Sequence, residues 1–131
     1  MTWNWRNRAK ERCESDNPPM MLDPVATNPD LYRVLYENDA VRVLEYHDRP
    51  GDRTKPHWHP DSVMYTLSSF RRLLVSGGQE RQVEIAEGSV SWVPAQEHSG
   101  ENVGDTETRV VFVEMKGSSS EPGTRLGPQP D

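Results

Sequence analysis

The sequence predicts an all-β protein: a single-domain jelly-roll β-barrel with a partly ordered N-terminal arm and a disordered C-terminal tail. Its 131 residues suffice for about one domain. Between residues 31 and 116, short runs rich in β-branched and aromatic residues alternate with turn residues, at the spacing of a sandwich or barrel. A helical pattern is scarce, since residues 9–13 alone look mildly helical. A double-sheet barrel closes the edges of such strands best.

Nine strands are expected, and each is a short run bounded by residues that favour turns. In chain order they cover residues 31–36, 41–46, 53–59, 62–67, 71–75, 82–85, 89–93, 98–102 and 109–115. The turns are marked by residues that tolerate a positive or fixed φ, namely Asn38-Asp39, Pro50-Gly51-Asp52, Gly77-Gly78 and Glu87-Gly88. Alternation predicts that Val111, Val113 and Met115 form an inward row on the last strand, and Trp58, Trp92 and Met64 are expected to fill the interior.

Composition divides the chain into three zones. Residues 1–30 form a polar arm that we expect to be partly ordered, and residues 31–116 form the barrel. Residues 117–131 are rich in Gly, Ser and Pro and have no apolar face to bury, which predicts a disordered tail.

Charge and cysteine content exclude several classes of partner. The formal net charge of −6 argues against binding of nucleic acid, which needs a clustered basic face. Cys13 is the single cysteine, so no intrachain disulfide is possible. No apolar run approaches the roughly 20 residues that span a bilayer, and residues 1–12 lack the apolar region of a secretory signal. We therefore expect a cytoplasmic protein that binds neither membrane nor nucleic acid.

Three of the four histidines form the most informative pattern. His57 and His59 lie two residues apart on an expected strand, so they project from the same face. His98 follows another turn and is the natural third ligand of one ion. Three neutral imidazoles suit Fe, Ni, Zn or Cu better than Mg or Ca, and they leave open positions for substrate.

These histidines and their neighbours resemble the two sequence motifs of the cupin family. The first motif begins with Gly, five residues and His-x-His, and the second runs from Gly through Pro and His to Asn. The matching residues are Gly51, His57 and His59, then Gly88, Pro94, His98 and Asn102. One residue is missing between Pro94 and His98. The resemblance covers about residues 34–115, and it implies a jelly-roll barrel, a metal site and pairing into a homodimer.

The departures from the cupin pattern also carry information. Val63 or Met64 occupies the position at which many cupins have a glutamate ligand, and neither residue binds a hard cation. The resemblance therefore implies a site of three histidines, unlike that of germin-like or oxalate oxidase-like cupins. Cysteine dioxygenase-like and diketone dioxygenase-like cupins use a three-histidine iron centre. Lewis-acid isomerase, dehydratase or lyase chemistry would use the same open site.

Three further residues are candidates for catalysis. Tyr65 shares strand parity with the His57 pair if no bulge intervenes, so its hydroxyl would face the cavity; a structural tyrosine is the alternative. Glu45 would point inward, to act as a base or to replace the missing carboxylate. Arg71 and Arg72 alternate in direction, so one of them, Arg72, would clamp a substrate carboxylate unless both are solvated.

Side chains near the histidines are expected to orient them. Asp61, Glu101 and Asn102 are candidates to accept the outer N–H of the imidazoles, or else they serve turns.

Two classes of function remain open from the sequence. The first is a metal-dependent oxygenase or lyase/isomerase that acts on a small anionic or chelating organic substrate. The second is a non-catalytic module that binds a small molecule. Metal-free acid–base catalysis by a tyrosine, an arginine and a histidine is a further alternative.

Overall fold

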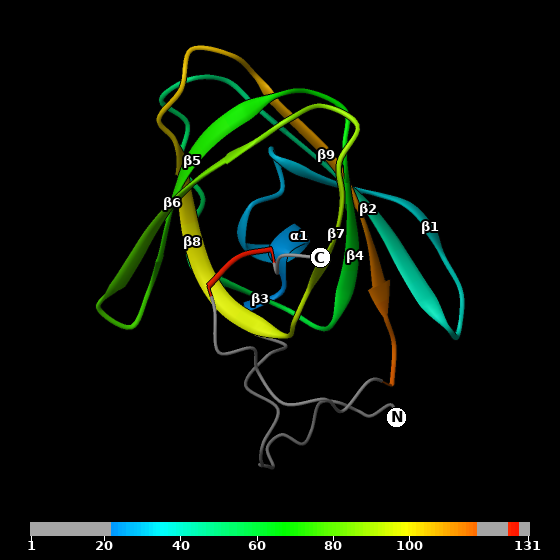
Figure 1. Cartoon of the computed structure of the whole chain (residues 1–131). Coiled ribbons are helices and arrows are strands. Elements are labelled where there is room, and N and C mark those ends of the chain that lie inside the picture. The colour runs from blue at the N-terminus through cyan, green and yellow to red at the C-terminus, as the bar shows by residue number, and fades with distance from the viewer. Residues whose placement is uncertain (1–21, 118–125, 129–131) are drawn as a thin grey trace.

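The computed structural model describes residues 22–117 and 126–128 and consists of two antiparallel sheets that face each other across a barrel interior (Figure 1). One sheet has the order β1-β2-β9-β4-β7 and the other β3-β8-β5-β6. The strands are β1 Tyr32–Glu37, β2 Val41–Asp48, β3 His57–His59, β4 Ser62–Thr66, β5 Phe70–Ser76, β6 Gln79–Ile85, β7 Val90–Val93, β8 Gln96–Asn102 and β9 Thr108–Met115. The predicted all-β jelly-roll class is confirmed. No helix among the described residues is long and apolar enough to cross a membrane.

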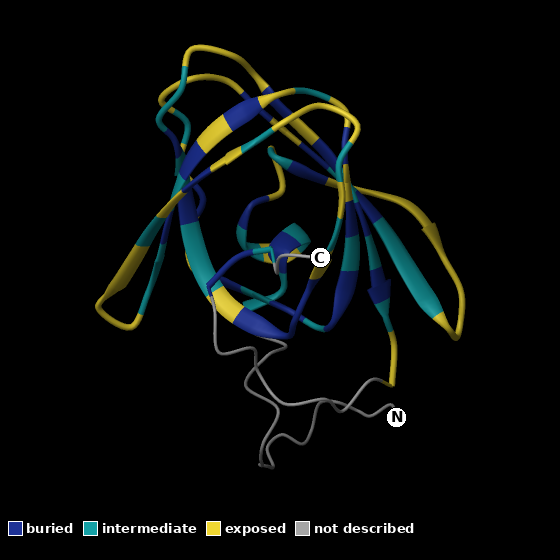
Figure 2. Cartoon of the chain, in the orientation of Figure 1, coloured by how far each residue is buried: buried dark blue, intermediate teal, exposed yellow. Residues whose placement is uncertain are grey.

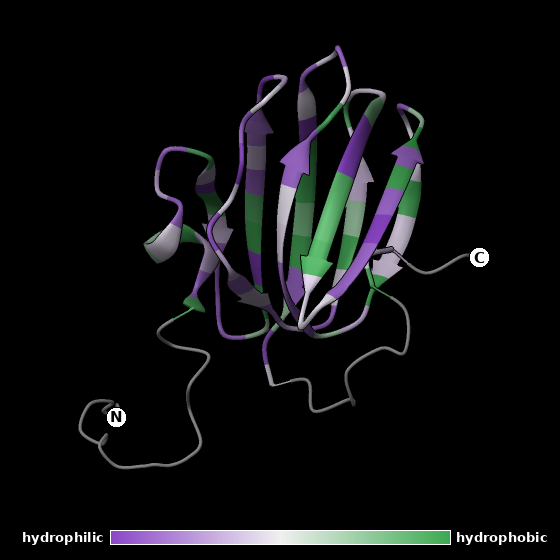
Figure 3. Cartoon of the chain, turned by 90° about the vertical axis from the view of Figure 1, so that its left-hand side faces the viewer, coloured by the Kyte–Doolittle hydropathy of each residue, from purple (hydrophilic) through white to green (hydrophobic). Residues whose placement is uncertain are grey.

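The core lies between the two sheets, and buried residues recur along strands of both sheets (Figure 2). The central cluster consists of Tyr32, Leu44, Tyr46, Met64, Phe70, Val93, Val110 and Phe112. Hydrophilic and hydrophobic segments alternate along the strands (Figure 3), as expected where successive side chains point to opposite faces. Met64 is buried as predicted, whereas Trp92 is 45% exposed on the outer face.

The predicted inward row on the last strand is wrong by one residue. In β9 the buried side chains are Thr108, Val110, Phe112 and Glu114, so Val111, Val113 and Met115 face outward. The register pairs Leu44 with Phe112 inside the barrel and Val43 with Val113 outside it. Because the outer face of this sheet is also apolar, hydrophobicity alone does not identify the inner face, and an error of one residue inverts the strand.

A short helix, α1 (Pro24–Thr27), leads into the barrel and was not predicted. The Asp23 side chain accepts hydrogen bonds from the Val25 and Ala26 N–H groups at its start. The Asn28 side chain accepts from the Lys55 N–H at 2.7 Å and joins this segment to the chain before β3. The mildly helical residues 9–13 lie outside the described residues.

Residues at the C-terminal end of the described chain pack on the four-stranded sheet. Leu126 is 6% exposed and clusters with Leu74 and Val83. The Gly127 N–H donates to Gln96 Oε1 at 2.9 Å, and Arg81 donates to the Leu126 carbonyl. Residues 126–128, which the sequence placed in a disordered tail, therefore form part of the barrel wall.

Candidate metal centre

The three histidines predicted as ligands lie close together inside the barrel. His57 and His59 lie on β3, and pairing with β8 places His98 directly opposite His57. Their candidate ligand atoms all lie within 4.8 Å of one another. His57 is 1% exposed and His59 is fully buried. The structure thus brings together the three histidines that the sequence selected.

The Nδ1 atom of each imidazole, on the side away from the other two rings, lies beside an atom that can only accept a hydrogen bond. His57 Nδ1 lies 2.8 Å from the Lys55 carbonyl oxygen, and His59 Nδ1 lies 2.8 Å from Glu114 Oε2. His98 Nδ1 lies 2.7 Å from Gln96 Oε1, and the amide of Gln96 is oriented by donation from its Nε2 to the Pro94 carbonyl at 3.0 Å. Each Nδ1 must therefore carry the proton, which leaves each Nε2 as a lone-pair donor.

These acceptors differ from the residues predicted for this role. Asp61 accepts from the Ala95 N–H instead, and Glu101 pairs with Arg53. Asn102 donates to Asp48 and to the Thr106 carbonyl. Motif position does not reveal these acceptors, because Glu114 on β9 lies outside both motifs and Lys55 accepts through its backbone carbonyl.

Tyr32 makes a contact that the sequence did not indicate. Its hydroxyl lies 3.1 Å from His57 Nε2 and 3.2 Å from His59 Nε2. One hydroxyl proton can satisfy only one of these two lone pairs, so the other faces the buried site without a proton. A buried lone pair left in this way is costly, and a cation bound between the rings would satisfy it. The donor set therefore fits a transition metal.

Burial keeps the ligands in the neutral form that binds metal. Loss of solvation, with the nearby His59, lowers the pKa of His57 to about 3. Loss of solvation also holds the pKa of His98 well below its usual value, with His59 and His57 as further causes. Neither ring needs to lose a proton at neutral pH before an ion binds.

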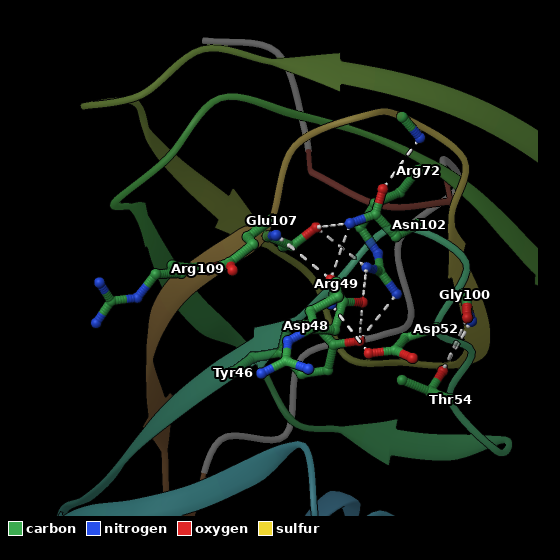
Figure 4. A network of polar contacts seen from close by, with 12 residues as sticks. Tyr46, Asp48, Arg49, Asp52, Thr54, Arg72, Gly100, Asn102, Glu107 and Arg109 are labelled. Carbon is green, nitrogen blue, oxygen red and sulfur yellow. Dashed lines mark hydrogen bonds and ion pairs between the residues drawn. The ribbon is translucent and has the colours of Figure 1, made fainter.

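A buried polar network lies beside the histidines and joins both sheets (Figure 4). Arg72 on β5 donates to Asp48 Oδ2 at 2.6 Å and to the Tyr46 hydroxyl at 3.2 Å. Asn102 donates to Asp48 Oδ1 at 3.0 Å, and Thr108 accepts from both Arg72 and Asn102. The charges of Arg72 and Asp48 thus balance each other inside the barrel.

His57, His98 and this network border the same cavity, which has a volume of about 60 Å³. His57, His98 and Tyr32 line one part of it, and Arg72 and Thr108 line another. The rest of the wall is largely apolar and includes Phe70, Leu74, Val83, Ile85, Val93, Val110 and Phe112, with Gly127 and Pro128 from the C-terminal segment. This volume is well below the roughly 300–1,000 Å³ of pockets for drug-sized ligands, so it suits only a molecule of a few heavy atoms.

Two of the three predicted catalytic side chains lie outside this cavity. Tyr65 is 43% exposed on the outer face of β4. The chain passes from one sheet to the other between His59 and Ser62, so strand parity does not carry over from the histidines. Glu45 is also on the outer face and pairs with Arg33 at 2.6 Å and Arg109 at 3.3 Å. Both inward placements are wrong, whereas Arg72 does point inward and Arg71 outward.

Comparison with solved structures relates this barrel to known proteins. No family model and no curated protein match the chain. A cupin domain from Bordetella pertussis superposes with a TM-score of 0.62 and 28% identity, over 66% of this chain and 92% of that one. A cupin family protein with a double-stranded β-helix fold from Methanocaldococcus jannaschii has a TM-score of 0.54 at 14% identity, over 65% and 78% of the two chains. A double-stranded β-helix protein from Klebsiella pneumoniae has a TM-score of 0.53 at 22% identity, over 66% and 76%.

Proposed function

We propose that this cupin-fold protein is a small metalloenzyme in which His57, His59 and His98 hold a divalent transition metal. The observation that supports this most is the convergence of three imidazoles inside the barrel, with an acceptor behind each ring and with His57 and His98 at the wall of a cavity. Neutral nitrogen ligands favour Fe, Ni, Zn or Cu.

The proposed substrate is a small organic anion that can chelate the ion. Three neutral ligands leave the dipositive charge of an ion uncompensated, and an anionic group would offset that charge. Bound metal would supply Lewis-acid activation for isomerase, dehydratase or lyase chemistry, and iron would add dioxygenase-type oxidation. The volume of about 60 Å³ limits the guest to a compact molecule.

The side chains around the proposed site have distinct tasks. Phe70, Val110 and Phe112 form an apolar wall that keeps bulk water out. Arg72 presents a buried cation to the cavity, although its contact with Asp48 competes with the predicted clamp on a substrate carboxylate. We propose that Arg72 orients the guest through this network, together with Thr108.

Binding of a chelating anion to cobalt-loaded protein tests this proposal. We expect Co(II) to bind at one equivalent and its visible d–d spectrum to change when acetohydroxamate, an anionic bidentate chelator, is added. His98→Ala should abolish the response. His47→Ala is the matched control, since His47 is exposed and pairs with Glu107 outside the barrel, and it should behave as the parent. An unchanged spectrum of the loaded parent at high chelator concentration would contradict an open, substrate-binding metal site.

We also propose that the protein forms a homodimer through the outer face of its five-stranded sheet. The register places one apolar side chain from every strand in a single row across this face: Tyr36, Val43, Val113, Val63 and Trp92. A second row contains Val111, Tyr65 and Val90. Charged pairs border the rows, with Arg33–Glu45–Arg109 and Lys116–Glu37.

A second copy of the chain suits this face best. The surface is a sheet with an apolar centre and a rim that carries both signs of charge, so it can complement itself about a two-fold axis. Tyr36, Tyr65, Val90 and Trp92 are each more than 40% exposed on this face, and contiguous exposed apolar side chains often mark an interaction surface.

Mass measurement in solution tests the dimer. Light scattering across a concentration series should give twice the chain mass for the parent and one chain mass for Trp92→Glu. Glu84→Lys, on the exposed side of β6 in the other sheet, is the control and should remain dimeric. A parent that is monomeric at all concentrations would rule out the dimer.

A further inference from the structure

Tyr32 occupies a position that its role as a core residue does not explain. It is the first residue of β1 and is 5% exposed, with its ring 4.7 Å from that of Tyr46. The hydroxyl, however, points between His57 and His59 and lies within hydrogen-bond distance of both inner nitrogens. We propose that the oxygen of Tyr32 is a fourth protein ligand of the metal ion. This inference rests on the metal centre proposed above and deepens it.

The separation of the atoms supports coordination. Two ligand atoms that each lie about 2.1 Å from one ion are about 3.0–3.4 Å apart at octahedral or tetrahedral angles. The Tyr32 oxygen lies 3.1 and 3.2 Å from the two Nε2 atoms, which is within this range for both pairs. A hydrogen-bonding role alone accounts for this position less well, because the single hydroxyl proton serves one nitrogen and leaves the other unpaired.

Two carboxylates lie near the histidines, and both already have other partners. The Glu114 carboxylate lies behind His59, bound to Nδ1 at 2.8 Å and to Arg42 at 3.1 Å. Asp48 is paired with Arg72. The cluster that can hold an ion, among the residues that the structure describes, contains the three histidines and no carboxylate. We infer that Tyr32 supplies the oxygen ligand in place of the glutamate that the motif lacks.

The surroundings of Tyr32 hold its ring in this orientation. Its ring centroid lies 5.4 Å from that of His57, 5.7 Å from that of His59 and 6.3 Å from that of Phe112. Rings packed on several sides leave little freedom for rotation, which is the condition for a precise ligand. As a ligand, Tyr32 would bind as the phenolate after losing its hydroxyl proton to solvent. It would lower the net charge at a divalent ion by one, and the remaining positive charge would still favour an anionic guest.

Phenolate coordination has a spectroscopic signature that is independent of catalysis. A tyrosine bound to Fe(III) or Cu(II) gives a charge-transfer band in the visible region, and tyrosine is an established ligand of protein-bound iron. The experiment uses the full chain with one equivalent of Cu(II) or Fe(III), and follows absorption together with ion content after dialysis. Resonance Raman spectra excited within the band identify tyrosinate vibrations.

The expected result is a visible band in the parent that disappears in Tyr32→Phe, while this variant still retains one ion with at least 10-fold weaker affinity. Tyr65→Phe is the control, because Tyr65 is an exposed tyrosine on the outer face, and it should keep the band. A parent that binds the ion without a tyrosinate band, or a band that survives in Tyr32→Phe, overturns the role of Tyr32 and leaves the three-histidine centre standing. A parent that binds no ion overturns both.

Discussion

Replacement of Arg72 by methionine is expected to lower the free energy of unfolding by about 3–5 kcal/mol. Arg72 donates to Asp48 at 2.6 Å, and the Asp48 side chain has no exposed area. Methionine would leave the Asp48 carboxylate charged and without its cation in the interior of the barrel. Chemical denaturation of the metal-free proteins, followed by tryptophan fluorescence, measures the difference.

Two further variants identify the cause of this loss. Arg71→Met alters the neighbouring residue on the outer face of β5 and should change stability by less than about 0.5 kcal/mol. The double variant Arg72→Met/Asp48→Asn should regain part of the lost stability, because it also removes the uncompensated charge. Equal losses for Arg71→Met and Arg72→Met would show that the buried pair is not the source.

Replacement of Glu114 by glutamine is expected to weaken metal binding by about 10–100-fold. Glu114 Oε2 accepts the Nδ1 proton of His59 at 2.8 Å, while Arg42 holds Oε1 at 3.1 Å. The negative charge makes the His59 ring a better donor and fixes its direction, and glutamine lacks that charge. Competition titration of Zn(II) against a chelator measures the affinity.

Glu45→Gln provides the matched control for this titration. Glu45 is a carboxylate on β2, the strand paired with β9, but it faces outward and contacts Arg33 and Arg109. Its replacement should leave the affinity for Zn(II) unchanged. Parent-like binding by Glu114→Gln would mean that this carboxylate does not support His59 as a ligand.

The sequence motifs predicted that the three histidines lie together, because a His-x-His pair and a later histidine report geometry that is local to adjacent strands. His57 and His98 are direct partners across β3 and β8. Tyr32 and Glu114 were missed because they lie on β1 and β9, far from the motifs along the chain. Only the closure of the barrel brings them to the histidines, and no spacing rule links them in the sequence.

The side of each strand that faces the interior was harder to predict than the position of the strand in the sequence. Val111, Val113 and Met115 are apolar, whereas the true inner row on β9 contains Thr108 and Glu114. Polar residues in a strand usually indicate its outer face. In β9 they lie inside, because Glu114 accepts from His59 and Thr108 accepts from Arg72. The helix α1 did have a signal, since Asp23 followed by Pro24 is a typical helix start.

The central claim, that three histidines hold a metal ion, is tested most directly by elemental analysis. The protein is purified without added metal and without a histidine tag, beside the His57→Ala/His59→Ala double variant and His47→Ala. We expect close to one equivalent of Fe, Ni, Zn or Cu in the parent and in His47→Ala, and none in the double variant. A parent that is empty and cannot be loaded with any of these four ions would contradict the claim.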